Sequence, residues 1–169
     1  YLADQIESFV ANRSSRSKVA VLRETTPLGT AGAIGMMPAA EDPVLVLNGD
    51  IVTNVNLAAL LEFHTRHDHD ATIAVAQHRV SIPYGVVRHG ADGQFLGIEE
   101  KPTLINYVAA GIYFLSPAYR ALVGPGQPLD MPELLTRGGE IGLKAGLFPI
   151  HENWTDVGRP EDLELARNR

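Results

Sequence analysis

Two carboxylates stand where apolar stretches end, and they have the chemistry of a divalent-cation site. Asp50 closes the run PVLVLNGD, and Asp156 lies in NWTDV beside the only tryptophan, Trp154. Ligands of open α/β sheets bind beyond the carboxyl ends of the strands, and Mg²⁺ prefers hard oxygen ligands. Each carboxylate also has a plain structural interpretation. Asp50 would cap the next turn, and Asp156 would be a surface residue beside a core tryptophan.

A glycine-rich loop, Leu28-Gly29-Thr30-Ala31-Gly32, precedes a segment that can start a helix. Backbone N–H groups at a helix start suit anions, and glycine lets a flat base approach closely. The loop is neither a Walker loop nor a GxGxxG fingerprint. A simple turn therefore remains the alternative to a nucleotide contact.

Charged residues also end a later predicted strand, in Glu99-Glu100-Lys101-Pro102. Lys101 suits a phosphate and Glu100 suits hydroxyl groups, while a solvated charge cluster before a proline is the alternative. The six histidines show no metal-ligand spacing, and no Ser-His-Asp set can be argued.

Helices and strands alternate around these residues. Helical spacing of apolar residues predicts helices at 1–10 and 56–68, with Asn56 as an N-cap. Strands are predicted at 18–24, 43–47, 71–78, 107–115, 143–150 and 153–157. Strand 43–47 is apolar on both faces and is expected to be central and parallel. Strand, helix, strand predicts a βαβ unit and a largely parallel sheet.

The later part of the chain has turn and cap signals. Residues 90–93 predict a hairpin turn between two short strands. A short helix over MPELLTRGG is expected to end at its glycines, and RPEDLELARNR is expected to form a closing helix. No linker or internal repeat is found, so residues 1–169 are expected to form a single domain.

Composition excludes several classes of protein. With 45% hydrophobic and 20% charged residues, the 169-residue chain is not a disordered tail. A net charge of −6 argues against a general nucleic-acid binder. There is no cysteine, and no apolar run reaches the roughly 18 residues of a membrane helix. A cytoplasmic protein without a membrane or nucleic-acid partner is expected.

Taken in order, the motifs resemble those of the sugar-1-phosphate nucleotidyltransferases. The motifs are PLGTAGA, VLNGD, PYGVV, EEKP, AGIYFL and WTDVGRPEDL, and the resemblance runs from about Pro27 to Ala166. The type is that of the mannose-1-phosphate guanylyltransferases. VSIPYGVV, LDMPELL and FPIHENWTDVGRPEDLELA resemble the branch often encoded behind paired CBS domains.

This resemblance implies a fold and a set of roles. The fold would be a Rossmann-like α/β nucleotidyltransferase domain with a mixed, mainly parallel sheet. Asp50 and Asp156 would bind Mg²⁺, and Lys101 would hold the sugar phosphate as the third catalytic residue. The nucleotide would contact Leu28, Gly29, Thr30, Asn48 and Gly49. The sugar phosphate would contact Tyr84, Gly85, Glu100, Lys101 and Gly111.

The implied reaction is an in-line attack of a sugar 1-phosphate on the α-phosphorus of an NTP, with GTP favoured. An NDP-sugar and pyrophosphate would form without a covalent intermediate, so positioning and charge would do most of the catalysis. Two alternatives stay open. One is a non-catalytic nucleotide-sugar-binding or regulatory module of the same fold. The other is a glycosyltransferase, although Asn48-Gly49-Asp50 retains only the last Asp of a DxD motif.

The sequence departs from the family pattern in two places. The family's glycine-rich N-terminal segment, with its Arg and a later Lys-Pro, is not found in these residues. We therefore expect an N-terminally truncated domain that is inactive alone, its sheet completed by the missing segment or by a second copy in a homo-oligomer. Ala109 stands where many relatives have an Asn that contacts the sugar.

Overall fold

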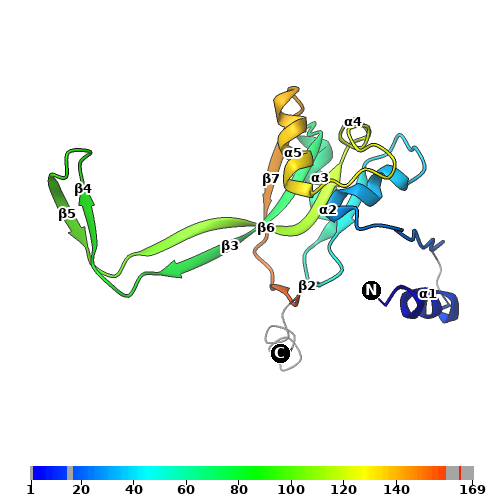
Figure 1. The fold of residues 1–169 in the computed structure, drawn as a ribbon, viewed down its shortest axis with the longest axis horizontal. Coiled ribbons are helices and arrows are strands. Elements are labelled where there is room, and N and C mark those ends of the chain that lie inside the picture. The colour runs from blue at the N-terminus through cyan, green and yellow to red at the C-terminus, as the bar shows by residue number, and fades with distance from the viewer. Residues whose placement is uncertain (1, 15–16, 159–163, 165–169) are drawn as a thin grey trace.

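The computed structural model describes residues 2–14, 17–158 and 164. Its centre is a four-stranded sheet with the strand order β1-β6-β3-β7 (Figure 1). The strands are β1 (Val44–Leu47), β6 (Thr103–Leu115), β3 (Ala71–Ser81) and β7 (Ala145–Pro149). Except for residue 164, the predicted closing helix lies outside the described residues.

The sheet is mixed, as expected, but its described ladders are not mainly parallel. β6 pairs antiparallel with both β1 and β3, and only β3 and β7 form a parallel ladder. β1, helix α3 (Leu57–Arg66) and β3 follow one another as predicted, but β6 lies between the two strands. The order of elements along the chain does not reveal that a later strand enters this gap.

Two strand predictions are wrong. β1 lies at the edge of the described sheet and not at its centre. Its apolar run reflects packing on both faces, since Val44 and Val46 contact one core cluster and Leu45 contacts the other. Residues 18–24 form no strand, because no described strand lies alongside to pair with them, and Val19 is exposed.

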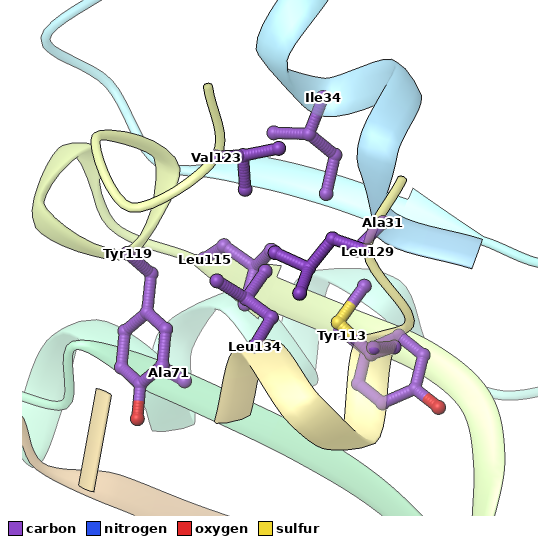
Figure 2. Close-up of a cluster of buried hydrophobic side chains, with 10 residues drawn as sticks. Ala31, Ile34, Ala71, Tyr113, Leu115, Tyr119, Val123, Leu129 and Leu134 are labelled. Atoms are coloured by element: carbon purple, nitrogen blue, oxygen red, sulfur yellow. The ribbon is translucent and has the colours of Figure 1, made fainter. Parts of the chain in front are cut away.

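Strand β6 divides the core into two hydrophobic clusters. Tyr113 and Leu115 belong to the cluster drawn in Figure 2, whereas Ile112 and Phe114 belong to the other. Successive side chains of a strand point to opposite faces, so one strand supplies both clusters. The buried half of β6 therefore holds the two layers of helices together.

Helices cover both faces of the sheet. The first cluster packs short helices and α5 against the strands: α2 (Gly29–Gly32), η1 (Ala33–Met36), α4 (Pro117–Arg120) and α5 (Met131–Glu140). Helix α3 covers the other face through Leu60. Asn56 is the predicted N-cap of α3, and its Oδ1 accepts hydrogen bonds from the N–H groups of Ala58 and Ala59, both at 3.1 Å.

Beyond this body, β3 and β6 continue alone as a two-stranded arm, residues 77–107, which projects away from the sheet (Figure 1). The predicted hairpin is confirmed at its tip as β4 (Val86–His89) and β5 (Phe95–Glu99). The β3–β6 register shifts between Ile73 and Val75, where Gly111 of β6 has a positive φ. The irregularity in the ladder thus lies just before the start of the arm.

The predicted first helix is present as α1 (Ala3–Asn12), but its apolar side chains Ile6 and Phe9 are exposed. Arg23 forms ion pairs with Asp4 and Glu7 of this helix. Within the described residues, no helix combines the length and the apolar character that a membrane crossing requires.

Two adjacent glycines of α5 give a test of the core. A methyl group on the buried Gly138 would overlap the ring of Tyr119, which is fully buried, whereas Gly139 faces open space. Gly138→Ala should lower the free energy of unfolding by about 1–3 kcal/mol. Gly139→Ala should raise it by up to about 1 kcal/mol through helix propensity. Urea unfolding of both variants measures this, and equal effects would contradict the packing described.

The buried His64 gives a test of pH dependence. Its Nδ1 lies 2.9 Å from Thr72 Oγ1, and its ring stacks on Phe114. Burial lowers the pKa of His64, the positive field of His69 lowers it further, and Asp70 opposes the shift. The unfolded chain therefore binds a proton more readily than the folded chain. Stability is retained above the ordinary pKa of 6.5 and is lost as the pH falls below it.

His64→Gln should flatten this dependence, which amounts to at most about 1.4 kcal/mol per pH unit for one proton. Denaturant unfolding near pH 7.5 and near pH 5.5 measures the difference. The exposed His67 is the control, and His67→Gln should keep the wild-type slope. A wild-type slope in His64→Gln would place the pH sensitivity elsewhere.

Candidate functional site

A surface depression of about 480 Å³ lies at the end of β1 and the start of α2. It is lined by Thr30, Leu47, Asn48, Gly49 and Asp50. Thr30 is distant in sequence from Asn48 and Gly49, and all three are expected to contact a nucleotide. They line the same depression. The tertiary contact that joins them comes from the packing of α2 and β1 on one core cluster.

Gly111 of β6 fixes the chain as it leaves β1. The Asn48 N–H donates to the Gly111 carbonyl oxygen at 2.9 Å. Gly111 has a φ of 71°, and a Cβ added there would lie 2.8 Å from Asn48 Nδ2. Glycine is thus required both for the backbone conformation and for this close approach. In this structure Gly111 lies beside Asn48.

The two carboxylates lie next to each other. β2 (Ile51–Thr53) pairs antiparallel with β8 (Trp154–Asp156), and Ile51 is opposite Asp156. The Val157 N–H extends this ladder by donating to the Asp50 carbonyl oxygen at 2.8 Å. A Cβ placed on Gly158 would lie 2.9 Å from Asp50 Oδ2 and 3.1 Å from Asp156 Oδ1. The two oxygens are therefore at most about 6 Å apart.

The donor chemistry of this pair fits Mg²⁺. Asp156 Oδ1 accepts a hydrogen bond from the Gly158 N–H at 2.8 Å, and no described residue donates to the Asp50 carboxylate. No group of three or more His, Cys, Asp and Glu side chains with metal-binding geometry occurs in the described part of the chain. Mg²⁺ is commonly held by one or two carboxylates, with waters and substrate phosphates as the other ligands. A pair of carboxylates is sufficient for such a site.

Trp154 anchors the strand that carries Asp156. Its Nε1–H donates to the Ala110 carbonyl oxygen at 2.8 Å, and its side chain packs against the second core cluster. The interpretation of Trp154 as a core anchor is therefore confirmed. Asp156, two residues later on β8, is exposed.

Leu28 and Gly29 do not line the depression. The Leu28 side chain is only 4% exposed, so it is part of the protein interior. Gly29 has a φ of 74°, and a Cβ there would lie 2.6 Å from Asp130 Oδ1. Of the three loop residues proposed to contact the nucleotide, only Thr30 reaches the depression.

Apart from Gly111, the residues expected at the sugar phosphate form a separate group at the base of the β4–β5 hairpin. The Lys101 N–H donates to the Tyr84 carbonyl oxygen at 3.2 Å. A Cβ on Gly85 would lie 3.0 Å from Glu100 Oε2. Four residues from two motifs, PYGVV and EEKP, thus meet.

This hairpin group does not share a site with the carboxylates in this structure. The stretch of β6 from Gly111 to Thr103 separates them, and at about 3.3 Å per residue it spans roughly 25 Å. The same separation is visible in Figure 1, where the hairpin lies at the far end of the arm from β1 and β2. Lys101 therefore does not lie beside Asp50 in this structure.

The sequence pattern of one protein family, described as Nucleotidyl transferase, matches residues 3–169. The chain belongs to this family. Among its relatives, mannose-1-phosphate guanylyltransferase 1 of Arabidopsis thaliana is 32% identical over 161 residues, covering 86% of this chain and 42% of that protein. The mannose-1-phosphate guanylyltransferase catalytic subunit beta of Dictyostelium discoideum is 31% identical over 152 residues, with coverage of 86% and 42%.

A solved structure has a fold similar to that of this chain. HddC from Yersinia pseudotuberculosis, complexed with GMP-PN, superimposes with a TM-score of 0.70 at 25% identity, covering 99% of this chain and 74% of that chain. The α/β fold with a mixed sheet is thereby confirmed for this member of the nucleotidyl transferase family. The chain spans less than half the length of the two curated relatives named.

The sequence analysis assigned no role to two residues that contact the candidate site. Gly158 lies against both carboxylates, and its place directly after the WTDV segment was the available signal. Asp130 contacts Thr30 from the segment LDMPELL, which carried no assigned role. The contact between Thr30 and Asp130 does not follow from local sequence, since the two residues are a hundred positions apart.

Gly111 provides a test of the geometry around Asn48. Gly111→Ala should introduce positive-φ strain and a steric conflict with the Asn48 side chain. Gly126 is the control, because it has a similar φ of 69° but faces open space. Gly126→Ala should lose about 1–2 kcal/mol of unfolding free energy, and Gly111→Ala about 1–3 kcal/mol more. Equal losses in denaturant unfolding would show that the Asn48 contact adds nothing.

Proposed function

We propose that the full-length protein transfers a nucleotidyl group from an NTP, with GTP favoured, to a sugar 1-phosphate. The products are an NDP-sugar and pyrophosphate. The observation that carries the proposal is the pairing of Asp50 and Asp156 within about 6 Å, beside a depression lined by Thr30 and Asn48. Membership of the nucleotidyl transferase family and the similarity to mannose-1-phosphate guanylyltransferases support it.

Asp50 and Asp156 are proposed to hold Mg²⁺ through their carboxylate oxygens. The ion would supply positive charge where two polyanions must meet. In the reaction, an oxygen of the sugar phosphate forms a bond to the α-phosphorus of the NTP. The bond from that phosphorus to the oxygen that joins it to the β-phosphorus breaks, and pyrophosphate leaves with this oxygen as one of its terminal oxygens. Positioning and charge carry such a transfer, since no protein nucleophile is needed.

The remaining residues are proposed to bind the two substrates. Thr30, Asn48 and Gly49 would lie along the nucleoside, because they line the depression beside Asp50. The hairpin group would hold the sugar phosphate, with Lys101 as its cation. Since roughly 25 Å of strand separates the two groups, this role requires the arm to bring the hairpin towards β1. The irregular ladder at Val75 and Gly111 is where we place the bend.

Replacing one carboxylate should abolish most of the activity. Asp50→Asn in the full-length protein should lower Mg²⁺-dependent pyrophosphate release from GTP and mannose 1-phosphate by about 10² or more. Asp156→Asn should act in the same way. Asp42, which is exposed just before the other end of β1, is the matched control, and Asp42→Asn should retain wild-type turnover.

Unchanged turnover in Asp50→Asn would contradict the proposed role of Asp50 as a metal ligand. The separation of Lys101 from the carboxylates favours one alternative, a non-catalytic module that binds nucleotide sugars. A wild-type protein that binds an NDP-sugar without releasing pyrophosphate from any NTP and sugar 1-phosphate would establish that module instead.

A further inference from the structure

The segment before α5 is bound to the loop that begins α2. The Leu129 N–H donates to the Leu28 carbonyl oxygen at 2.8 Å, and the Ala31 N–H donates to the Leu129 carbonyl oxygen at 2.9 Å. Leu129 and Ala31 are both buried in the first core cluster. The backbone of LDMPELL and that of the LGTAG loop therefore form one packed unit.

Within this unit, two helix starts cap each other. Asp130 is the N-cap of α5, yet its side chain makes no capping bond within its own helix. Its Oδ1 instead accepts from the Thr30 N–H at 3.0 Å and from the Thr30 hydroxyl at 3.4 Å. In return, Thr30 Oγ1 accepts from the Met131 N–H at 2.8 Å. Each residue satisfies a terminal N–H group of the other helix, which would otherwise lack a partner.

Two neighbouring residues favour this crossed arrangement. Pro132 occupies the first turn of α5 and has no N–H, which removes one donor that Asp130 would ordinarily cap. Gly29 lets the loop approach Asp130, since a Cβ there would lie 2.6 Å from the carboxylate and its φ is positive. Gly29 thus leaves space for the Asp130 carboxylate, and Pro132 leaves that carboxylate without one of its usual donors, so that it can bind Thr30.

The reciprocal caps between Thr30 and Asp130 determine which chemical group of a ligand Thr30 can bind. The Thr30 N–H is already bound to a carboxylate, and that negative charge at the start of α2 disfavours a second anion. The loop is therefore unsuited to a phosphate, contrary to the general expectation for a glycine-rich helix start. An uncharged part of a nucleotide, its base or its ribose, suits the surface that Thr30 presents to the depression.

We propose that Asp130 is a positioning residue that holds Thr30 in place for the uncharged nucleoside part of the NTP. Asp130 does not line the depression and acts through Thr30. This inference rests on the proposed function, because it assumes that the depression takes the nucleoside. Its removal is expected to weaken NTP binding and to leave the chemical step and the sugar 1-phosphate site nearly unaffected.

The test uses the full-length protein, with GTP and mannose 1-phosphate as substrates. Asp130→Ala should raise the KM for GTP about tenfold, the effect of losing one charge-assisted hydrogen bond. The kcat and the KM for mannose 1-phosphate should stay within about twofold. Asp130→Asn should recover most of the loss, because its amide oxygen still accepts from the Thr30 N–H. Glu133→Gln, an exposed change in the first turn of α5, is the control and should match the wild type.

Three results would overturn the inference. They are an unchanged KM for GTP in Asp130→Ala, equal changes in every kinetic constant, or an Asp130→Asn variant as impaired as Asp130→Ala. If Asp130→Ala does not fold, Asp130→Ser replaces it, because serine can still cap α5 but is one atom too short to keep the bond to the Thr30 N–H. Faster amide exchange at Thr30 in Asp130→Ser than in Asp130→Asn supports the contact, and equal exchange rejects it. A wild-type protein that neither turns over nor binds GTP defeats the proposed function itself, and the nucleotide role of Asp130 with it.

Discussion

Strand β6 is the constraint on which the rest of the structure depends. Its last residues pair with β1 on one side and β3 on the other, and their alternating side chains supply both core clusters. Gly111, within the same strand, accepts the hydrogen bond that directs Asn48 away from β1. On the N-terminal side of Gly111, β3 is the only described strand that pairs with β6, and β6 becomes one side of the exposed arm. One strand thus joins the body, the site and the arm.

The candidate site lies where two weakly supported pieces of chain are held by the body. β2 and β8 are short and pair only with each other among the described strands. They are kept in place by Trp154, whose indole reaches the carbonyl of Ala110 on β6. The proximity of Asp50 and Asp156 is therefore secured from the core outwards. Two exposed carboxylates so close together repel each other, which is a state that a bound cation stabilises.

The depression and the arm illustrate two ways of placing functional groups. Around the depression, Thr30 is fixed by crossed helix caps and Asn48 by the close approach of Gly111, so preorganisation comes from short contacts within the body. On the arm, the contacts of Lys101 and Glu100 with other described residues come from their own hairpin. An isolated two-stranded ribbon is marginally stable in water, which makes the arm the adaptable part of the fold.

The sequence by itself determined the local elements and the candidate residues. Helical spacing and the Asn56 cap predicted α3, turn glycines predicted the β4–β5 hairpin, and six ordered motifs indicated the nucleotidyl transferase family. Tertiary structure alone decided the insertion of β6 between β1 and β3, the pairing of Asp50 with Asp156, and the stretch of β6 that separates Lys101 from both. The physical reason is that side-chain periodicity records which faces are buried. It carries no information about which strand lies alongside, and that neighbour sets every long-range distance in the site.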